Sequence, residues 1–151
     1  MDSEMLVQMN TYPSRSPFPA SSLMVILDHP CIPTVVLGVE DEMMLRMRAV
    51  NMVEDAGYTP LEALDAAEAV AILESRSDVA LVCTDIQMPG TMDGVGLAHA
   101  VHARWPTIRI LVVSGQLDLP HLDLPPRSRF LGKPLNAGEV IAEMRDMIGH
   151  A

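Results

Sequence analysis

The sequence predicts an α/β protein in which helices cover both faces of a parallel β-sheet. Short apolar runs of strand length alternate with segments of helical period between residues 34 and 148. Continuous apolar strands separated by amphipathic helices are typical of parallel sheets that are buried on both faces. The chain has 151 residues, and 49% of them are hydrophobic, so it can bury one core within one domain.

Residues 34–57 predict the first strand and the first helix. Residues 34–39 form an apolar, β-branched run, which indicates a buried strand. Residues 42–56 carry apolar side chains at helical spacing, and we expect these to face the core: Met43, Met47, Val50 and Val53. Gly57 is placed to end this helix in a left-handed cap.

Residues 58–75 predict the second strand and helix. The apolar run in 58–64 is weaker and contains Pro60. Proline cannot donate to the hydrogen-bond ladder, so this strand belongs at an edge of the sheet. Residues 65–75 are rich in alanine, with apolar side chains on one helical side, and predict a helix.

Residues 79–105 repeat the pattern. Residues 79–84 form a second continuous apolar run, which predicts a central strand, and Cys83 within it is expected to be a small buried side chain. Residues 94–105 predict a helix that Pro106 closes.

The last part of the pattern is less regular. Residues 108–113 predict a third strongly buried strand and residues 130–132 a short final one. Between them, residues 116–128 contain three prolines, so a long helix is not expected there. The final helix, in 136–148, begins with an Asn-Ala-Gly-Glu sequence that resembles a capping box.

Composition excludes several functional classes. The chain has 20 acidic against 10 basic residues and no basic stripe, which argues against nucleic-acid binding. Its apolar stretches are too short to span a membrane, and its acidic start does not resemble a secretory signal. Cys31 and Cys83 lack metal-ligand spacing, so we expect a cytoplasmic protein.

Residues 1–33, rich in proline and serine, predict a flexible leader before a domain at 34–148.

Polar residues follow the strong strands where each strand ends. Glu40 and Asp41 follow the first, Asp85 the third, Ser114 the fourth and Lys133 the fifth. Ligands of open parallel sheets bind beyond the carboxyl ends of the strands. We therefore expect these five residues to lie at one functional edge.

The chemistry of this set favours phosphoryl transfer. Three carboxylates at short range raise one another's pKa, and a hard divalent cation such as Mg²⁺ relieves their repulsion. A carboxylate beside Mg²⁺ and a lysine can accept a phosphoryl group, because both cations neutralise the transferred oxygens. Ser114 can donate a hydrogen bond to one of those oxygens.

Each residue also has a simpler interpretation. Asp41 is favourable at a helix N-terminus through the helix dipole. Asp85 and Ser114 are ordinary turn residues, and an isolated lysine is usually solvated. It is their joint occurrence at successive strand ends that favours a site over these separate explanations.

Four segments in order, VVLGVEDE, LVCTDIQMPGTMDG, ILVVSG and FLGKPL, resemble the signature segments of response-regulator receiver domains. The resemblance covers residues 34 to about 148 and implies a flavodoxin-like, doubly wound, five-stranded parallel sheet of order 2-1-3-4-5. The helix between the fourth and fifth strands would be short or absent. Glu40 stands where many members have an aspartate.

The resemblance implies a role for each matching residue. Asp85 would be the phospho-acceptor, with self-catalysed transfer and autodephosphorylation instead of a conventional enzyme activity. Asp41 would bind Mg²⁺ directly, Glu40 through a water molecule, and Gln87 through its backbone carbonyl. Lys133 would bridge Asp85 and the phosphoryl group.

Two further residues would form the switch. Ser114 would move toward the phosphoryl group, and the aromatic ring of Phe130 would follow that motion. The Lys133–Pro134 bond would be cis.

No output domain is expected after residue 148. The partners would therefore be a sensor histidine kinase or histidine phosphotransfer protein and an unknown downstream protein; homodimer formation stays open.

Three other interpretations compete with this one. A haloacid-dehalogenase-type phosphatase also uses an aspartate after a central strand, but it needs an acid two residues later, where this chain has Gln87. A receiver-like protein-binding module that works without phosphorylation is the main alternative. A purely structural cluster would be costly, since it buries carboxylates and a lysine without use.

Overall fold

The computed structural model describes residues 33–115 and 123–149. Five parallel strands form one sheet of order β2-β1-β3-β4-β5, which confirms the predicted fold class and strand order. The strands are β1 (Val35–Val39), β2 (Thr59–Ala63), β3 (Val79–Asp85), β4 (Arg109–Ser114) and β5 (Ser128–Gly132). Pro60 lies in β2, which is an edge strand as expected.

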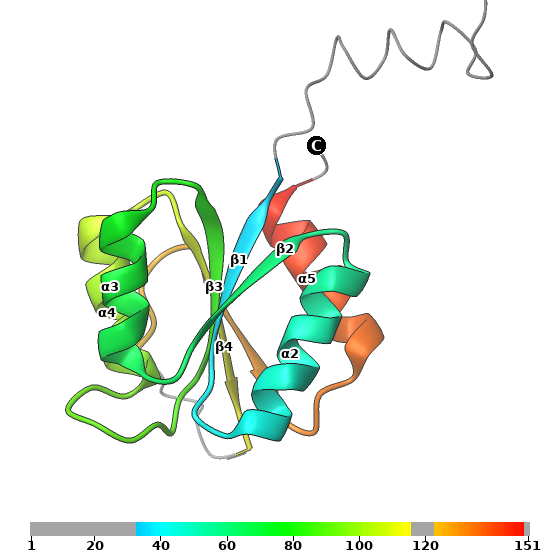
Figure 1. The fold of residues 1–151 in the computed structure, drawn as a ribbon, viewed down its shortest axis with the longest axis horizontal. Coiled ribbons are helices and arrows are strands. Elements are labelled where there is room, and N and C mark those ends of the chain that lie inside the picture. Colours follow the sequence, from blue (N-terminus) through cyan, green and yellow to red (C-terminus); the bar gives the residue numbers. More distant parts are fainter. Residues whose placement is uncertain (1–32, 116–122, 150–151) are drawn as a thin grey trace, which may run out of the picture. The chain divides into compact units, whose positions relative to one another are not determined.

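Four helices of the described residues cover the sheet. They are α2 (Met43–Asp55), α3 (Ala66–Ser75), α4 (Gly94–Arg104) and α5 (Ala137–Ile148). Figure 1 shows α3 and α4 on one face and α2 and α5 on the other. Each helix begins with an acidic or amide side chain that accepts a backbone N–H of its first turn, as N-caps do: Glu42, Asp65, Asp93 and Asn136.

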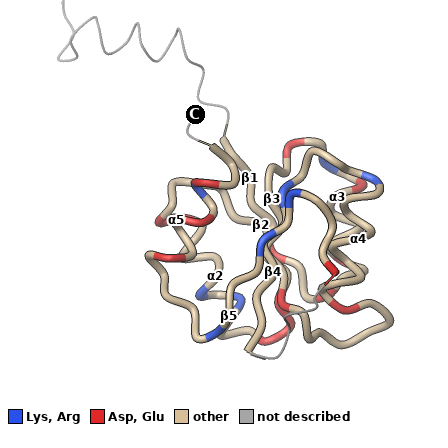
Figure 2. Tube along the Cα trace, turned by 180° about the vertical axis from the view of Figure 1, so that it is seen from behind, with Lys and Arg blue, Asp and Glu red and all other residues tan. Residues whose placement is uncertain are grey.

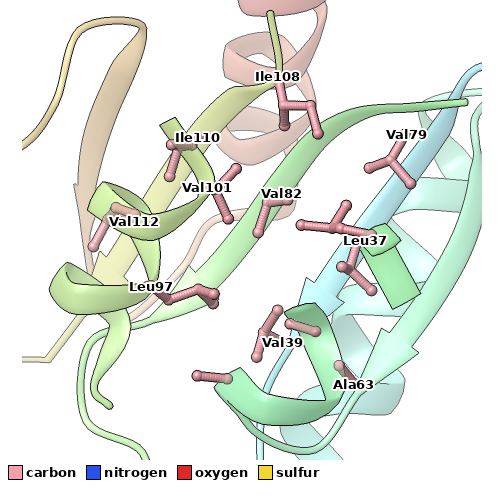
Figure 3. Close-up of a cluster of buried hydrophobic side chains, with 14 of the residues drawn as sticks. Leu37, Val39, Ala63, Val79, Val82, Leu97, Val101, Ile108, Ile110 and Val112 are labelled. Atoms are coloured by element: carbon pink, nitrogen blue, oxygen red, sulfur yellow. The ribbon is translucent and has the colours of Figure 1, made fainter. Parts of the chain in front are cut away.

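The core has one layer on each face of the sheet. The α3/α4 layer is built mainly of valine, leucine and isoleucine from β1, β3, β4 and α4, and Figure 3 shows these side chains meeting between strands and helices. The α2/α5 layer includes Met52, Met144 and Met147. These two apolar layers support the sheet beneath its carboxyl edge.

The prediction that Met43 and Met47 face the core is wrong. Their exposed fractions are 59% and 53%, whereas Met52 and Val53 are buried. Helix α2 packs on the sheet through its later turns, and its first turns extend past the packed layer. The partly buried side of these first turns is taken instead by Arg46, whose side chain is 15% exposed.

The segment between β4 and β5 is only partly described. The expectation of a short or absent helix concerns 116–128, of which 116–122 lie outside the described residues; 123–127 contain no helix. Strand β5 begins at Ser128, two residues before the predicted start. The predicted leader, residues 1–33, also lies outside the described residues except for Pro33.

Helix α4 ends at a packed aromatic residue. Trp105 is the C-cap of the helix and is partly buried against the α3/α4 layer. The guanidinium carbon of Arg104 lies 4.4 Å from the centroid of its ring, a cation–π distance. Trp105 precedes β4 and so lies near the amino ends of the strands.

No helix of the described residues is both long and apolar enough to cross a bilayer. In Figure 2 basic and acidic positions are both spread over the trace, and a few basic ones lie close together near the start of β5.

Candidate functional site

The carboxyl ends of four strands supply the polar residues of the site. Glu40 follows β1, Asp85 and Ser114 are the last residues of β3 and β4, and Lys133 follows β5. In the parallel register Asp85 pairs with Val113, and Ser114 pairs with Gly132. The sheet thereby brings residues 93 positions apart in the sequence to one edge, because parallel strands end together.

Asp85 and Lys133 form the centre of the site. The Lys133 ammonium donates to Asp85 Oδ2 at 2.7 Å. The Asp85 side chain is 11% exposed and that of Lys133 is 23% exposed. The other carboxylate oxygen, Oδ1, accepts a long hydrogen bond from the backbone N–H of Gln87 at 3.4 Å. A charged pair at this distance is strengthened by its partial removal from water.

Glu40 is the second carboxylate beside the lysine. Its Oε1 lies 3.8 Å from Lys133 Nζ, and its Oε2 accepts from the backbone N–H of Glu42 at 3.1 Å. Burial raises the pKa of Glu40 to about 7, and the negative charge of Asp85 acts in the same direction. A carboxyl group that is reluctant to ionise next to another carboxylate is what a bound cation would relieve.

The remaining predicted metal ligands lie around an open hollow. Asp41, Gln87 and Asp93 line it together with residues 86, 88 and 89. Within the described ranges, no three His, Cys, Asp or Glu side chains converge closely enough to hold a metal ion by themselves. Mg²⁺ keeps several waters and needs only one or two carboxylates from the protein, so this oxygen-rich donor set fits that ion.

Ser114 and Phe130 lie on the same face of neighbouring strands. Val112 pairs with Phe130 and Ser114 with Gly132, and side chains two residues apart along a strand share a face. Ser114 is 1% exposed and its carbonyl accepts from the N–H of Lys133 at 2.8 Å, whereas Phe130 is 38% exposed. The Lys133–Pro134 peptide bond is cis, as the resemblance implied.

Gly94 is a site residue that sequence reasoning missed. It begins α4 directly against the backbone of Asp85, and its N–H donates to the carbonyl of Ile86 at 2.8 Å. A Cβ atom at this position would overlap the Asp85 carbonyl group. The available signal was a glycine in the first turn of a predicted helix, where glycine is otherwise unfavourable.

A family model described as the response regulator receiver domain matches residues 36–145. The chain belongs to the response regulator receiver family. It is thus a receiver domain of the kind found in two-component systems.

Named relatives and solved structures agree with this assignment. Over 117 residues the receiver domain is 34% identical to a sensor kinase CckA of Brucella abortus, covering 75% of this chain and 12% of that protein. It is 36% identical over 88 residues to the C4-dicarboxylate transport transcriptional regulatory protein DctD of Rhizobium meliloti, covering 58% of this chain and 18% of that one. The chain therefore spans a small part of these relatives.

A receiver protein from Sinorhizobium medicae has the same fold, with a TM-score of 0.71 at 25% identity over 77% of this chain and 94% of that one. The receiver domain of a hybrid histidine kinase CckA gives a TM-score of 0.65 at 28% identity, covering 76% and 99%.

Proposed function

We propose that Asp85 accepts a phosphoryl group from a phosphohistidine in the presence of Mg²⁺, and that this modification switches the domain between two signalling states. The observation that carries the proposal is the 2.7 Å contact between Asp85 and Lys133 at the carboxyl edge of a receiver sheet. A lysine with only a solubilising role would extend into water and would not contact a nearly buried carboxylate. A phospho-acceptor, in contrast, needs a cation beside it to offset the charge of the transferred group.

The transfer step involves one bond formed and one broken. A carboxylate oxygen of Asp85 attacks phosphorus, the P–N bond to the donor imidazole breaks, and its electron pair returns to the imidazole nitrogen. Lys133 offsets the added negative charge and keeps the acceptor oriented. Hydrolysis by water would later release inorganic phosphate and restore the carboxylate, so the domain is a transient phosphoprotein and not a conventional enzyme.

Glu40, Asp41, Asp85 and the backbone carbonyl of Gln87 would hold Mg²⁺. When bound, the ion supplies positive charge to the transferred oxygens. The chain's own contribution is to place the Lys133 ammonium beside Asp85 and Glu40. A metal there also favours the ionised form of Glu40, whose pKa is raised in its absence.

The switch and the partners follow from the same site. Ser114 is buried behind Asp85 on the next strand, and Phe130 is partly exposed on the strand beyond it. A new phosphoryl group would draw the Ser114 hydroxyl toward it and allow the Phe130 ring to move inward. The donor would be a sensor histidine kinase or a histidine phosphotransfer protein, and the readout a protein that recognises this altered face.

The decisive experiment is intact-mass measurement after incubation with acetyl phosphate, with and without Mg²⁺. We expect a gain of about 80 Da, the mass of one phosphoryl group, only with Mg²⁺ and not in Asp85→Asn. Asp78→Asn is the matched control, since this exposed carboxylate pairs with Arg76 away from the site and should leave the gain intact. No gain under any condition would favour a binding module that works without phosphorylation.

A further inference from the structure

Two arginines of α2 reach the two loops that carry the charged residues of the site. Arg46 Nη1 donates to the backbone carbonyls of Glu40 at 3.1 Å and Asp41 at 3.4 Å. Arg48 Nη2 donates to the backbone carbonyl of Leu135 at 2.7 Å. One helix therefore contacts both the acidic loop after β1 and the loop that follows Lys133.

The space beside these hydrogen bonds is loosely packed. A cavity of about 180 Å³ lies between the first turns of α2 and the site, and it is lined by Leu45, Ala49 and Met52 of the helix and by Val39, Cys83 and Val113 of the sheet. Side chains do not fill this space, so tight packing cannot fix the loops there. Directed hydrogen bonds from a helix side chain can do so instead.

Arg46 is itself held in place. Its Nε donates to Glu62 Oε1 of β2 at 3.2 Å, and its side chain is only 15% exposed. The guanidinium thus spans the edge strand β2 and the acidic loop, using two nitrogens in a fixed geometry that a lysine cannot reproduce. Arg48 is exposed and uses a single nitrogen for its bond to Leu135.

We propose that Arg46 and Arg48 are positioning residues of the phospho-acceptor site: Arg46 holds the backbone that presents Glu40 and Asp41, and Arg48 holds the backbone that follows Lys133. The effects of these two residues on Mg²⁺ binding and on phosphoryl transfer rest on the proposed function. Loss of Arg46 would weaken Mg²⁺ binding, whereas loss of Arg48 would leave Mg²⁺ binding unchanged and slow phosphoryl uptake.

The first test does not depend on phosphorylation. Amide hydrogen exchange is compared at residues 40–42 and at 133–136 in wild type, Arg46→Gln and Arg48→Gln. We expect exchange about three- to tenfold faster at 40–42 only in Arg46→Gln, which loses two charge-assisted hydrogen bonds to that loop, and at 133–136 only in Arg48→Gln, which loses one. Equal changes in both loops, or no change in either, would overturn the proposal.

Arg145→Gln is the matched control. Arg145 also donates to a backbone carbonyl, that of Ala56 at 3.2 Å, but beyond the far end of α2. Its loss should leave exchange in both site loops at the wild-type rate. Arg48→Lys should restore most of the protection at 133–136, whereas Arg46→Lys should restore only part at 40–42, because Arg46 uses two nitrogens.

The second test separates the two duties. Mg²⁺ titration by calorimetry should show a severalfold weaker affinity for Arg46→Gln and an unchanged one for Arg48→Gln. At saturating Mg²⁺, uptake from acetyl phosphate should be severalfold slower in Arg48→Gln and near wild type in Arg46→Gln; the reverse split would refute these duties. If wild type takes up no phosphoryl group while the exchange pattern holds, the proposed function fails and the positioning of the loops stands.

Discussion

Gly94 lies so close to the backbone of Asp85 that no other residue fits. A Cβ built on Gly94 would lie 2.7 Å from the Cα of Ile86, 2.8 Å from the carbonyl carbon of Asp85, and nearer still to the Asp85 oxygen. Backbone atoms of a central strand cannot move aside cheaply. We expect Gly94→Ala to lower the free energy of unfolding by about 3 kcal/mol or more, measured by urea denaturation with circular dichroism.

Gly96 provides the control for that prediction, two residues along the same helix. A Cβ there would lie 2.9 Å from Cγ of the flexible Met92 side chain, which can rotate away. Alanine is also the better helix former, so Gly96→Ala should lie within about 1 kcal/mol of wild type. Equal losses in the two variants would show that helix conformation, and not contact with Asp85, decides the cost.

The contact between Lys133 and Asp85 should contribute to stability. Lys133→Met would leave the carboxylates of Asp85 and Glu40 facing each other without their cation. We expect a loss of about 2 kcal/mol at pH 7, below the cost of breaking a fully buried pair because the lysine side chain is 23% exposed. Lys133→Arg keeps the charge and should lose less; a Lys133→Met variant as stable as wild type would contradict this.

The raised pKa of Glu40 should make the free energy of unfolding of the metal-free protein depend on pH. Burial raises the pKa of Glu40 to about 7, so the folded state retains a proton that the unfolded chain has lost above its ordinary carboxyl pKa. The contribution of Glu40 to stability should therefore fall as the pH rises through this interval up to about 7. Urea denaturation in chelator at several pH values would measure it.

Glu40→Gln tests the source of that pH dependence. The amide has the shape of the protonated acid and cannot ionise, so this variant should lose less stability than wild type between pH 5 and about 8. A slope identical to that of wild type would assign the effect to other groups. Added Mg²⁺ should stabilise wild type most at the alkaline end, because metal binding needs the ionised carboxylate.

Cys83 is half-buried and lines the cavity beside α2, so it is less buried than the sequence predicted, but its thiol should still be unreactive in the folded protein. Burial raises the pKa of its thiol to about 12, and the carboxylates of Asp85 and Glu40 act in the same direction. The thiolate is the reactive form, so iodoacetamide at pH 8 should modify Cys83 only after urea is added. Mass measurement in a Cys31→Ser background isolates this thiol, and rapid labelling without urea would contradict the prediction.

Much of the fold could be predicted from local pattern. The continuous apolar runs mark the central strands, and Pro60 correctly places β2 at an edge. The strand order itself came only from the family resemblance, since apolar runs do not say which strands are neighbours. The error at Met43 and Met47 has a related cause: helical spacing identifies residues that share a side, but not how far along the helix that side remains covered.

The site was partly predictable for a similar reason. Strand ends in a parallel sheet meet, so Glu40, Asp85 and Lys133 could be expected together, and the structure places them so. Contacts made by side chains to backbone atoms leave no pattern in the sequence. The bonds of Arg46 and Arg48 are of this kind, because each depends on where a distant carbonyl lies. At Gly94 the glycine itself was a signal, but the sequence does not say which backbone it lies against.

Trp105 offers a practical consequence of how α4 ends. It is the only tryptophan in the chain and lies against the core at the amino ends of the strands, under the guanidinium of Arg104. The fluorescence emission of Trp105 should change when the domain unfolds. It should barely change when Asp85 is phosphorylated at the opposite end of the sheet. Intrinsic fluorescence thus gives an optical signal for intactness that is independent of signalling state, and a variant that is merely inactive can be told from one that has unfolded.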